Sequence, residues 1–131
     1  MSTKDKIVIF DFGSQFTQLI ARRIRELNVY SEIINYSKIK KFKFEKNVKG
    51  VILSGGPSDV NKLGSPKIGF NFFNRSIPIL GICYGHQLIS KKLGGKIKSS
   101  TKREFGFAKL IKHKKSLLTD NFFSNSGHNS V

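Results

Sequence analysis

The chain has 131 residues, 38% of them hydrophobic and twelve of them Phe, which suits one domain with a real core but not two. Its only cysteine, Cys83, excludes an internal disulfide and a cysteine-ligated zinc cluster. No apolar run approaches the length of a membrane span, and the residues after Met1 are polar, unlike a signal peptide. The composition therefore predicts a soluble, cytoplasmic domain that carries no metal.

The formal net charge of +16 raises the question of a nucleic-acid partner. Only five of the 24 basic residues are Arg, the side chain that phosphate and base recognition favours, and the lysines are spread over every segment. They are densest in Ser37–Gly50. A lysine-rich solvated surface is the first interpretation, nucleic acid is not the expected partner, and a basic docking face for another anionic partner stays open.

The first elements are a strand and a helix. Lys6–Phe12 is a short β-branched apolar run, typical of a strand buried on both faces, and Gly13 ends it. A helix is predicted to follow as far as residue 27, with Ser14 as its N-cap. Its apolar residues recur at helical spacing: Phe16, Leu19, Ile20, Ile24 and Leu27.

The later elements alternate in the same way. Further strands are predicted at Tyr30–Tyr36, Gly50–Gly56, Ile77–Cys83 and Arg103–Lys112, a weak helix at Ile68–Phe73 and a helix at His86–Gly95. This order predicts an α/β fold with an open, mostly parallel sheet flanked by helices. From Lys114 the pattern dissolves, so the fold is expected to be incomplete at the C-terminus. Functional groups should gather beyond the carboxyl ends of the strands.

The segment "GICYG", Gly81–Gly85, has the glycine-x-nucleophile-x-glycine spacing of a nucleophile elbow, with Cys83 in the central place. A strand that turns abruptly into a helix holds its nucleophile in a strained conformation, and side chains two residues away on either side would collide. The amino-terminal amides of the helix would stabilise the Cys83 thiolate, and the Tyr84 N–H would face an oxyanion on the acylated sulfur. A buried, inert cysteine in a glycine-rich turn is the alternative.

The segment "LSGGPSD", Leu53–Asp59, follows a neighbouring strand, and its glycines allow a backbone amide to approach a ligand closely. Gly56, with Pro57 behind it, is the second candidate oxyanion donor. Taken alone, the segment could be an ordinary turn at a strand end.

Four segments together resemble the glutaminase domain of the GMP synthases, a branch of the class I glutamine amidotransferases with a flavodoxin-like sheet: "DFGSQFTQLIARRIREL", "GVILSGGPSDV", "PILGICYGHQLISKKLGG" and "REFGFAKL". The elbow and the GGP loop are common to the class, whereas "DFGSQ" and "REFG" indicate the GMP synthase branch. The resemblance covers nearly all of residues 1–131, read as a single amidotransferase domain.

The resemblance implies that Cys83 attacks the side-chain amide of L-glutamine and forms a thioester while ammonia leaves. Gly56 and Tyr84 would hold the oxyanion, and Gln87 would contact the bound glutamine. In the complete enzyme, which the resemblance implies is a homodimer, a synthetase (ATP-pyrophosphatase) domain would use the ammonia, ATP and Mg to convert XMP to GMP. No cofactor is expected in the amidotransferase domain itself.

The family's catalytic His and Glu come from a His-Pro-Glu segment, which does not occur in residues 1–131. The chain is therefore interpreted as truncated before that segment and inactive alone. A surface or packing role is expected for His86, His113 and His128. Two other functions stay open, a subunit of another class I amidotransferase and a basic, non-catalytic binding module.

Overall fold

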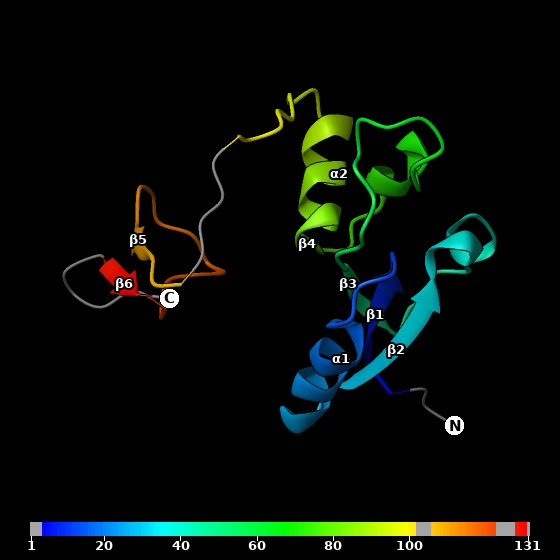
Figure 1. Cartoon of the computed structure of the whole chain (residues 1–131). Helices are drawn as coiled ribbons and strands as arrows, with labels where there is room; N and C mark the ends of the chain where they lie inside the picture. Colours follow the sequence, from blue (N-terminus) through cyan, green and yellow to red (C-terminus); the bar gives the residue numbers. More distant parts are fainter. Residues whose placement is uncertain (1–3, 102–105, 123–127, 131) are drawn as a thin grey trace. The chain divides into compact units, whose positions relative to one another are not determined.

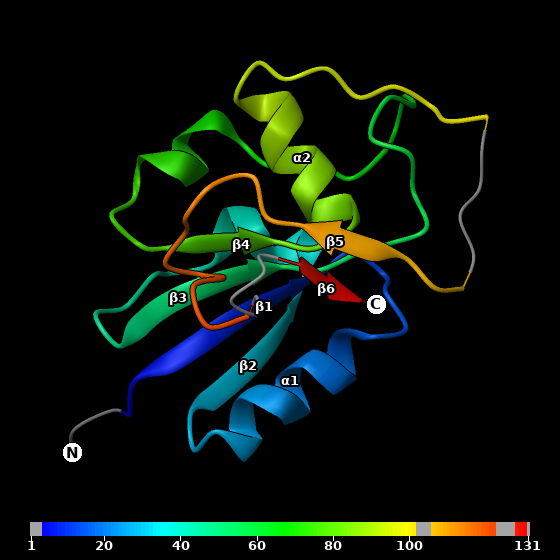
Figure 2. The same ribbon diagram turned by 90° about the vertical axis from the view of Figure 1, so that its left-hand side faces the viewer.

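The computed structural model describes residues 4–101, 106–122 and 128–130, and the chain forms two compact units, Met1–Ile97 and Lys98–Val131. The first unit contains a four-stranded parallel sheet made of β1 (Lys6–Asp11), β2 (Tyr30–Asn35), β3 (Val48–Leu53) and β4 (Ile79–Gly81). The strands lie in the order β2-β1-β3-β4 (Figures 1 and 2). The predicted parallel α/β fold is confirmed.

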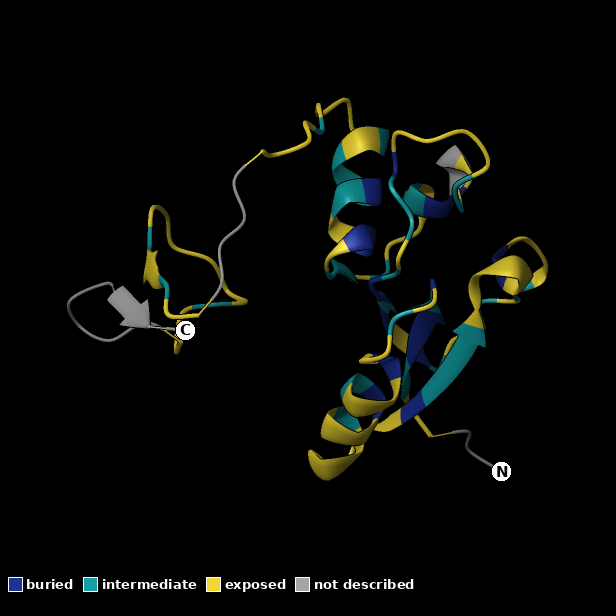
Figure 3. Cartoon of the chain, viewed as in Figure 1, coloured by how far each residue is buried: buried dark blue, intermediate teal, exposed yellow. Residues whose placement is uncertain are grey.

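The sheet is buried on both faces, as the continuous apolar runs predicted. Val8, Ile9 and Phe10 at the centre of β1 are fully buried although they alternate between the two faces. Figure 3 colours the chain by the burial of its residues. Helix α1 (Thr17–Glu26) packs against β1 and β2, and helix α2 (Tyr84–Lys92) packs against β3 and β4. Two 3-10 helices complete the unit, η1 (Tyr36–Lys41) and η2 (Phe70–Asn74).

Several of the phenylalanine side chains form one cluster around Phe10 of β1. The ring of Phe10 meets those of Phe42 and Phe72 edge-on, with centroids 5.5 and 5.8 Å apart, and Phe44 lies 4.9 Å from Phe42. Edge-to-face packing at these distances is the favourable arrangement for aromatic rings. The Arg75 guanidinium lies 4.1 Å from the centre of the Phe44 ring and covers the cluster. The cluster joins the segments around η1 and η2 to the central strand.

The predicted start of the first helix is wrong, and only Ile20 and Ile24 of its predicted apolar face are half-buried. Helix α1 begins at Thr17, its N-cap residue is Phe16, and Ser14 instead accepts a hydrogen bond from the Phe16 N–H in the preceding turn. Thr17 and Ala21 are the buried positions, whereas Phe16, Leu19 and Leu27 are exposed. The turn needs these extra residues because Gly13 takes a positive φ of 96° and donates its N–H to Asp11 Oδ1.

Other boundaries also differ from the prediction. Helix α2 begins at Tyr84, two residues earlier than expected, the weak helix is the 3-10 helix η2, and η1 lies where no helix was predicted. In the second unit the predicted strand at residues 103–112 is observed as β5 (Lys109–Ile111), which pairs antiparallel with β6 (His128–Ser130). Residues 103–105 lie outside the described residues.

Candidate functional site

The carboxyl ends of three strands meet at one cavity, as the sequence predicted. The turn after β1, the loop after β3 and the turn after β4 together line a cavity of about 350 Å³. Its lining residues are Gly13, Ser14, Gln15, Phe16, Gly55, Gly56, Pro57 and Cys83. Because neighbouring parallel strands end at the same edge of a sheet, residues as far apart in sequence as Gly13 and Cys83 face one space.

Cys83 has the strained backbone that a nucleophile elbow requires. It lies between β4 and α2, and its backbone has φ 52° and ψ −114°. Residues other than glycine rarely adopt a positive φ of this kind. The Cys83 residue is exposed. The flanking glycines are sterically required. A Cβ on Gly81 would lie 2.7 Å from the Gly85 carbonyl oxygen, and a Cβ on Gly85 would lie 2.1 Å from the Leu53 carbonyl oxygen. The observed turn therefore confirms the elbow geometry.

The GGP loop lies directly beside the thiol-bearing residue. A Cβ built on Gly55 would be 3.1 Å from the Cys83 Cβ, and a Cβ on Gly56 would be 2.1 Å from the Phe12 carbonyl oxygen. Close backbone approach therefore explains why both positions are glycine. Within residues 4–101 neither the Gly56 N–H nor the Tyr84 N–H has a hydrogen-bond acceptor. Gly56 lines the cavity, whereas Tyr84 is not among its lining residues.

The remaining candidate residues are distributed over α2 and the second unit. Gln87 is half-buried on α2, its backbone N–H donates to the Cys83 carbonyl over 3.1 Å, and it is not among the residues that line the cavity. His86 and His113 are exposed, and the described residues show no hydrogen bond between Cys83 and a histidine. The backbone of His128 lies in β6, and its side chain is outside the described part of the chain.

Three polar residues that the sequence interpretation missed lie within two positions, along the chain, of residues that line the cavity: Asp11, Thr17 and Ser54. The Thr17 hydroxyl donates to Asp11 Oδ1 over 2.9 Å and lies 3.2 Å from Ser54 Oγ. Ser54 is fully buried and Thr17 is 2% exposed. A signal was available, because Thr17 is a small polar residue among the apolar positions of α1 and Ser54 follows a buried strand directly. Buried hydroxyls of this kind are expected to have partners.

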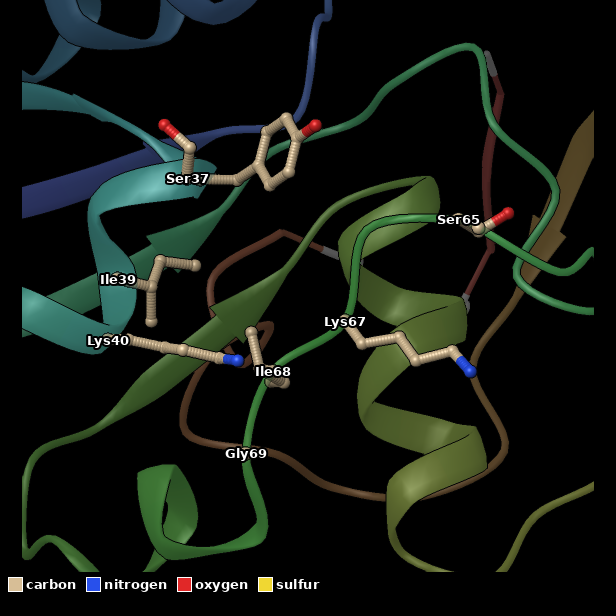
Figure 4. A pocket seen from close by; sticks show the side chains of 9 residues that line it. Ser37, Ile39, Lys40, Ser65, Lys67, Ile68 and Gly69 are labelled. Carbon is tan, nitrogen blue, oxygen red and sulfur yellow. The ribbon is translucent and has the colours of Figure 1, made fainter.

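A larger cavity of about 540 Å³ lies elsewhere in the first unit and does not contain Cys83 (Figure 4). It is formed between η1 and residues 64–69, and Lys40 extends across it toward Ile68. The smaller cavity is the better candidate site because it is lined by Cys83, with its strained backbone, and by Gly56.

The Tyr84 side chain is buried and does not line the cavity that contains Cys83. Its ring is 2% exposed and lies 5.5 Å from that of Phe12, and its hydroxyl donates to the Pro66 carbonyl. Burial raises the pKa of the Tyr84 phenol, and the nearby Asp59 carboxylate and Tyr36 add to the effect. The side chain therefore anchors the start of α2 to the loop that contains Pro66.

Replacing Tyr84 by Phe should lower the free energy of unfolding by an amount that depends on pH. At pH 8 we expect Tyr84→Phe to lose about 1 kcal/mol of unfolding free energy with the hydrogen bond to Pro66. Because the folded-state pKa is raised, the neutral phenol stabilises the native state below pH about 10, and this contribution is lost as the pH rises further. Urea titrations should show the difference between wild type and variant shrinking above pH 10.

The matched control is Tyr30→Phe, at a tyrosine that is half exposed. Because that side chain is exposed, the substitution should change the unfolding free energy at pH 8 by less than about 0.5 kcal/mol. A Tyr84→Phe difference that does not change between pH 8 and pH 11 would contradict the stated role of burial.

None of the helices in the described ranges 4–101, 106–122 and 128–130 is long and apolar enough to cross a membrane.

Proteins of known function are similar in sequence to this chain over most of its length. The GMP synthase [glutamine-hydrolyzing] of Marinobacter nauticus is 51% identical over 116 residues, which make up 88% of this chain and 22% of that protein. The GMP synthase [glutamine-hydrolyzing] of Brachyspira hyodysenteriae is 54% identical over an alignment of 110 residues that covers 81% of this chain and 21% of that protein. The chain thus spans about a fifth of the length of these relatives.

Solved structures show the same fold. The crystal structure of a candidate GMP synthase subunit from Thermoplasma acidophilum matches with a TM-score of 0.70 and 27% identity, over all of this chain and 64% of that chain. A glutamine amido transferase from Methylobacillus flagellatus matches with a TM-score of 0.53 over 82% of this chain and 46% of that chain, and at 17% identity it supports the fold alone.

The family model for glutamine amidotransferase class-I matches residues 8–130, a range that contains the elbow, the GGP loop and the turn after β1. The chain belongs to the class I glutamine amidotransferase family.

Proposed function

We propose that this chain is the glutamine-hydrolysing part of a GMP synthase, with Cys83 as the nucleophile that attacks the side-chain amide of L-glutamine. The observation that carries this proposal is the strained backbone of Cys83 at the start of α2, beside Gly55 and facing a cavity of about 350 Å³. A buried structural cysteine would need neither this exposure nor this conformation. The relatives that are about 50% identical support the choice of branch.

The proposed reaction begins when the Cys83 thiolate forms a bond to the amide carbon, and the carbonyl electrons move onto oxygen. The free N–H groups of Gly56 and Tyr84 would stabilise that oxyanion. The carbon–nitrogen bond then breaks, the nitrogen takes a proton and ammonia leaves, and a γ-glutamyl thioester remains on Cys83. Water hydrolyses the thioester to glutamate. Gln87, at the start of α2, is proposed to contact the glutamine.

Neither His86 nor His113 is assigned to proton transfer. His86 and His113 are exposed, and neither has a hydrogen bond with Cys83. A base must accept the thiol proton, and an acid must protonate the departing nitrogen. We therefore propose that the 131-residue chain contains the nucleophile and the oxyanion donors but not the proton-transfer groups.

The role of the complete enzyme is also a proposal. Ammonia would pass to a synthetase domain that uses ATP and Mg to convert XMP to GMP, in a cytoplasmic homodimer. Support comes from the GMP synthase relatives, of which this chain spans about a fifth.

The paired measurement is labelling of Cys83 and release of ammonia on the same 131-residue chain. A chloromethyl ketone built on the glutamine skeleton should alkylate Cys83, as peptide mass spectrometry would show, because alkylation needs only the thiolate, the oxyanion donors and the cavity. Ammonia release from glutamine should be slower than about one turnover per hour, since removal of catalytic-triad members leaves only a small residual rate.

Cys83→Ser is the control for labelling and should remain unmodified. Fast ammonia release that disappears in His86→Ala would contradict the assignment, because it would show that the histidine on α2 is the base.

A further inference from the structure

We propose that Asp11, Thr17 and Ser54 form a positioning network that fixes the Gly55–Gly56 peptide, so that the Gly56 N–H is directed as an oxyanion donor beside Cys83. This inference rests on the proposed function, because it specifies how that site is held in its reactive geometry.

The hydrogen bonds of the network determine where each hydroxyl proton goes. Thr17 has one hydroxyl proton, which it shares between Asp11 Oδ1, at 2.9 Å, and Ser54 Oγ, at 3.2 Å, so Ser54 Oγ is an acceptor toward Thr17. Ser54 Oγ also accepts the Phe12 N–H over 3.3 Å. Both lone pairs of Ser54 are therefore used, and its own proton is left for the Gly55 carbonyl, 3.2 Å away.

The hydrogen bond from Ser54 to the Gly55 carbonyl orients the next amide. The peptide between Gly55 and Gly56 is trans, and in a trans peptide the C=O and the N–H point in opposite directions. With the carbonyl held toward the buried Ser54 hydroxyl, the Gly56 N–H is directed away from it. Gly55 lies beside Cys83, and Gly56 lines the same cavity as Cys83.

A glycine pair needs such a restraint because its peptide plane can rotate more easily than one between residues with side chains. If the plane turned over, a carbonyl oxygen would take the place of the N–H and would repel the developing oxyanion. Thr17 and Ser54 are buried, so water cannot replace a lost partner between them without a rearrangement. The network also joins the turn after β1 to the loop after β3, two of the walls of the cavity.

The test compares two electrophiles on Cys83. Iodoacetamide reacts by direct displacement and forms no oxyanion, whereas the glutamine chloromethyl ketone develops negative charge on its carbonyl oxygen as the thiolate adds. Outright removal of an oxyanion donor costs about 100-fold to 1000-fold in rate, so loss of its orientation in Ser54→Ala should slow the chloroketone about 10-fold. The iodoacetamide rate should stay within about 2-fold, because the thiol itself is not changed.

Two further variants distinguish positioning from stability. Ser31→Ala removes another fully buried hydroxyl, which donates to the Ala21 carbonyl over 3.0 Å at the start of β2, away from the cavity. It should leave both labelling rates unchanged. If Ser54→Ala does not fold, Thr17→Val should slow the chloroketone selectively, and Thr17→Ser, which keeps the hydroxyl, should restore the rate.

Equal slowing of both reagents, or a chloroketone rate within 2-fold of wild type in Ser54→Ala and Thr17→Val, would overturn the positioning role while the proposed function stands. Failure of L-glutamine to protect wild-type Cys83 from the chloroketone would instead overturn the proposed function, and the positioning role with it.

Discussion

Gly85→Ala is expected to lower the free energy of unfolding by about 3 kcal/mol, which is more than the loss expected for Tyr84→Phe or Gly69→Ala. The new Cβ would lie 2.1 Å from the carbonyl oxygen and 2.6 Å from the carbonyl carbon of Leu53, and both atoms are backbone of β3. The Gly85 N–H also bonds the Ser54 carbonyl, so α2 cannot move away without breaking that contact. Helix propensity alone predicts the opposite sign, because alanine is favoured over glycine inside a helix by about 1 kcal/mol.

The matched control is Gly69→Ala. Gly69 has φ −69°, and no atom lies within 4 Å of a Cβ built there, so this substitution should change stability by less than about 0.5 kcal/mol. Urea unfolding followed by circular dichroism gives both values. Equal stability of Gly85→Ala and Gly69→Ala would contradict the close contact between α2 and β3.

Cys83→Gly is expected to have two effects of opposite sign. Labelling by glutamine-shaped electrophiles should disappear, because the nucleophile is gone. The unfolding free energy should rise by about 1 kcal/mol, because glycine adopts φ 52° and ψ −114° without the strain that the cysteine carries. The gain is limited by the greater conformational freedom of glycine in the unfolded chain.

Cys83→Ala separates the two effects. It removes the thiol but keeps a Cβ at the strained position, so labelling should be lost without a gain in stability. If Cys83→Gly were less stable than Cys83→Ala in the same urea titration, the backbone strain assigned to the elbow would be contradicted.

The sequence predicted the sheet and the position of the nucleophile because both depend on local rules. A strand buried on both faces must be a continuous apolar run, and β1 is one, with Val8, Ile9 and Phe10 fully buried. An abrupt strand-to-helix turn requires small residues on both sides of Cys83, and Gly81 and Gly85 meet that requirement. Parallel strands then bring Gly56 and Cys83 to one cavity.

The features that the sequence did not predict depend on contacts between distant residues. Nothing local to Thr17 shows that it will meet Ser54, which is 37 residues away, or that this pair will replace an apolar contact between α1 and the sheet. The predicted start of α1 was wrong for a similar reason. Serine is a residue type that favours the N-cap, but Asp11 accepts a hydrogen bond from Gly13 in the turn after β1, and Ser14 lines the cavity instead.

The most direct test of the central claim, that Cys83 faces a glutamine site, is the dependence of its labelling rate on glutamine in the full 131-residue chain. The account predicts that labelling by the L-glutamine chloromethyl ketone saturates with reagent concentration, that L-glutamine slows it competitively, and that D-glutamine has little effect. A labelling rate that rises linearly with reagent concentration, with no protection by L-glutamine, would contradict the account.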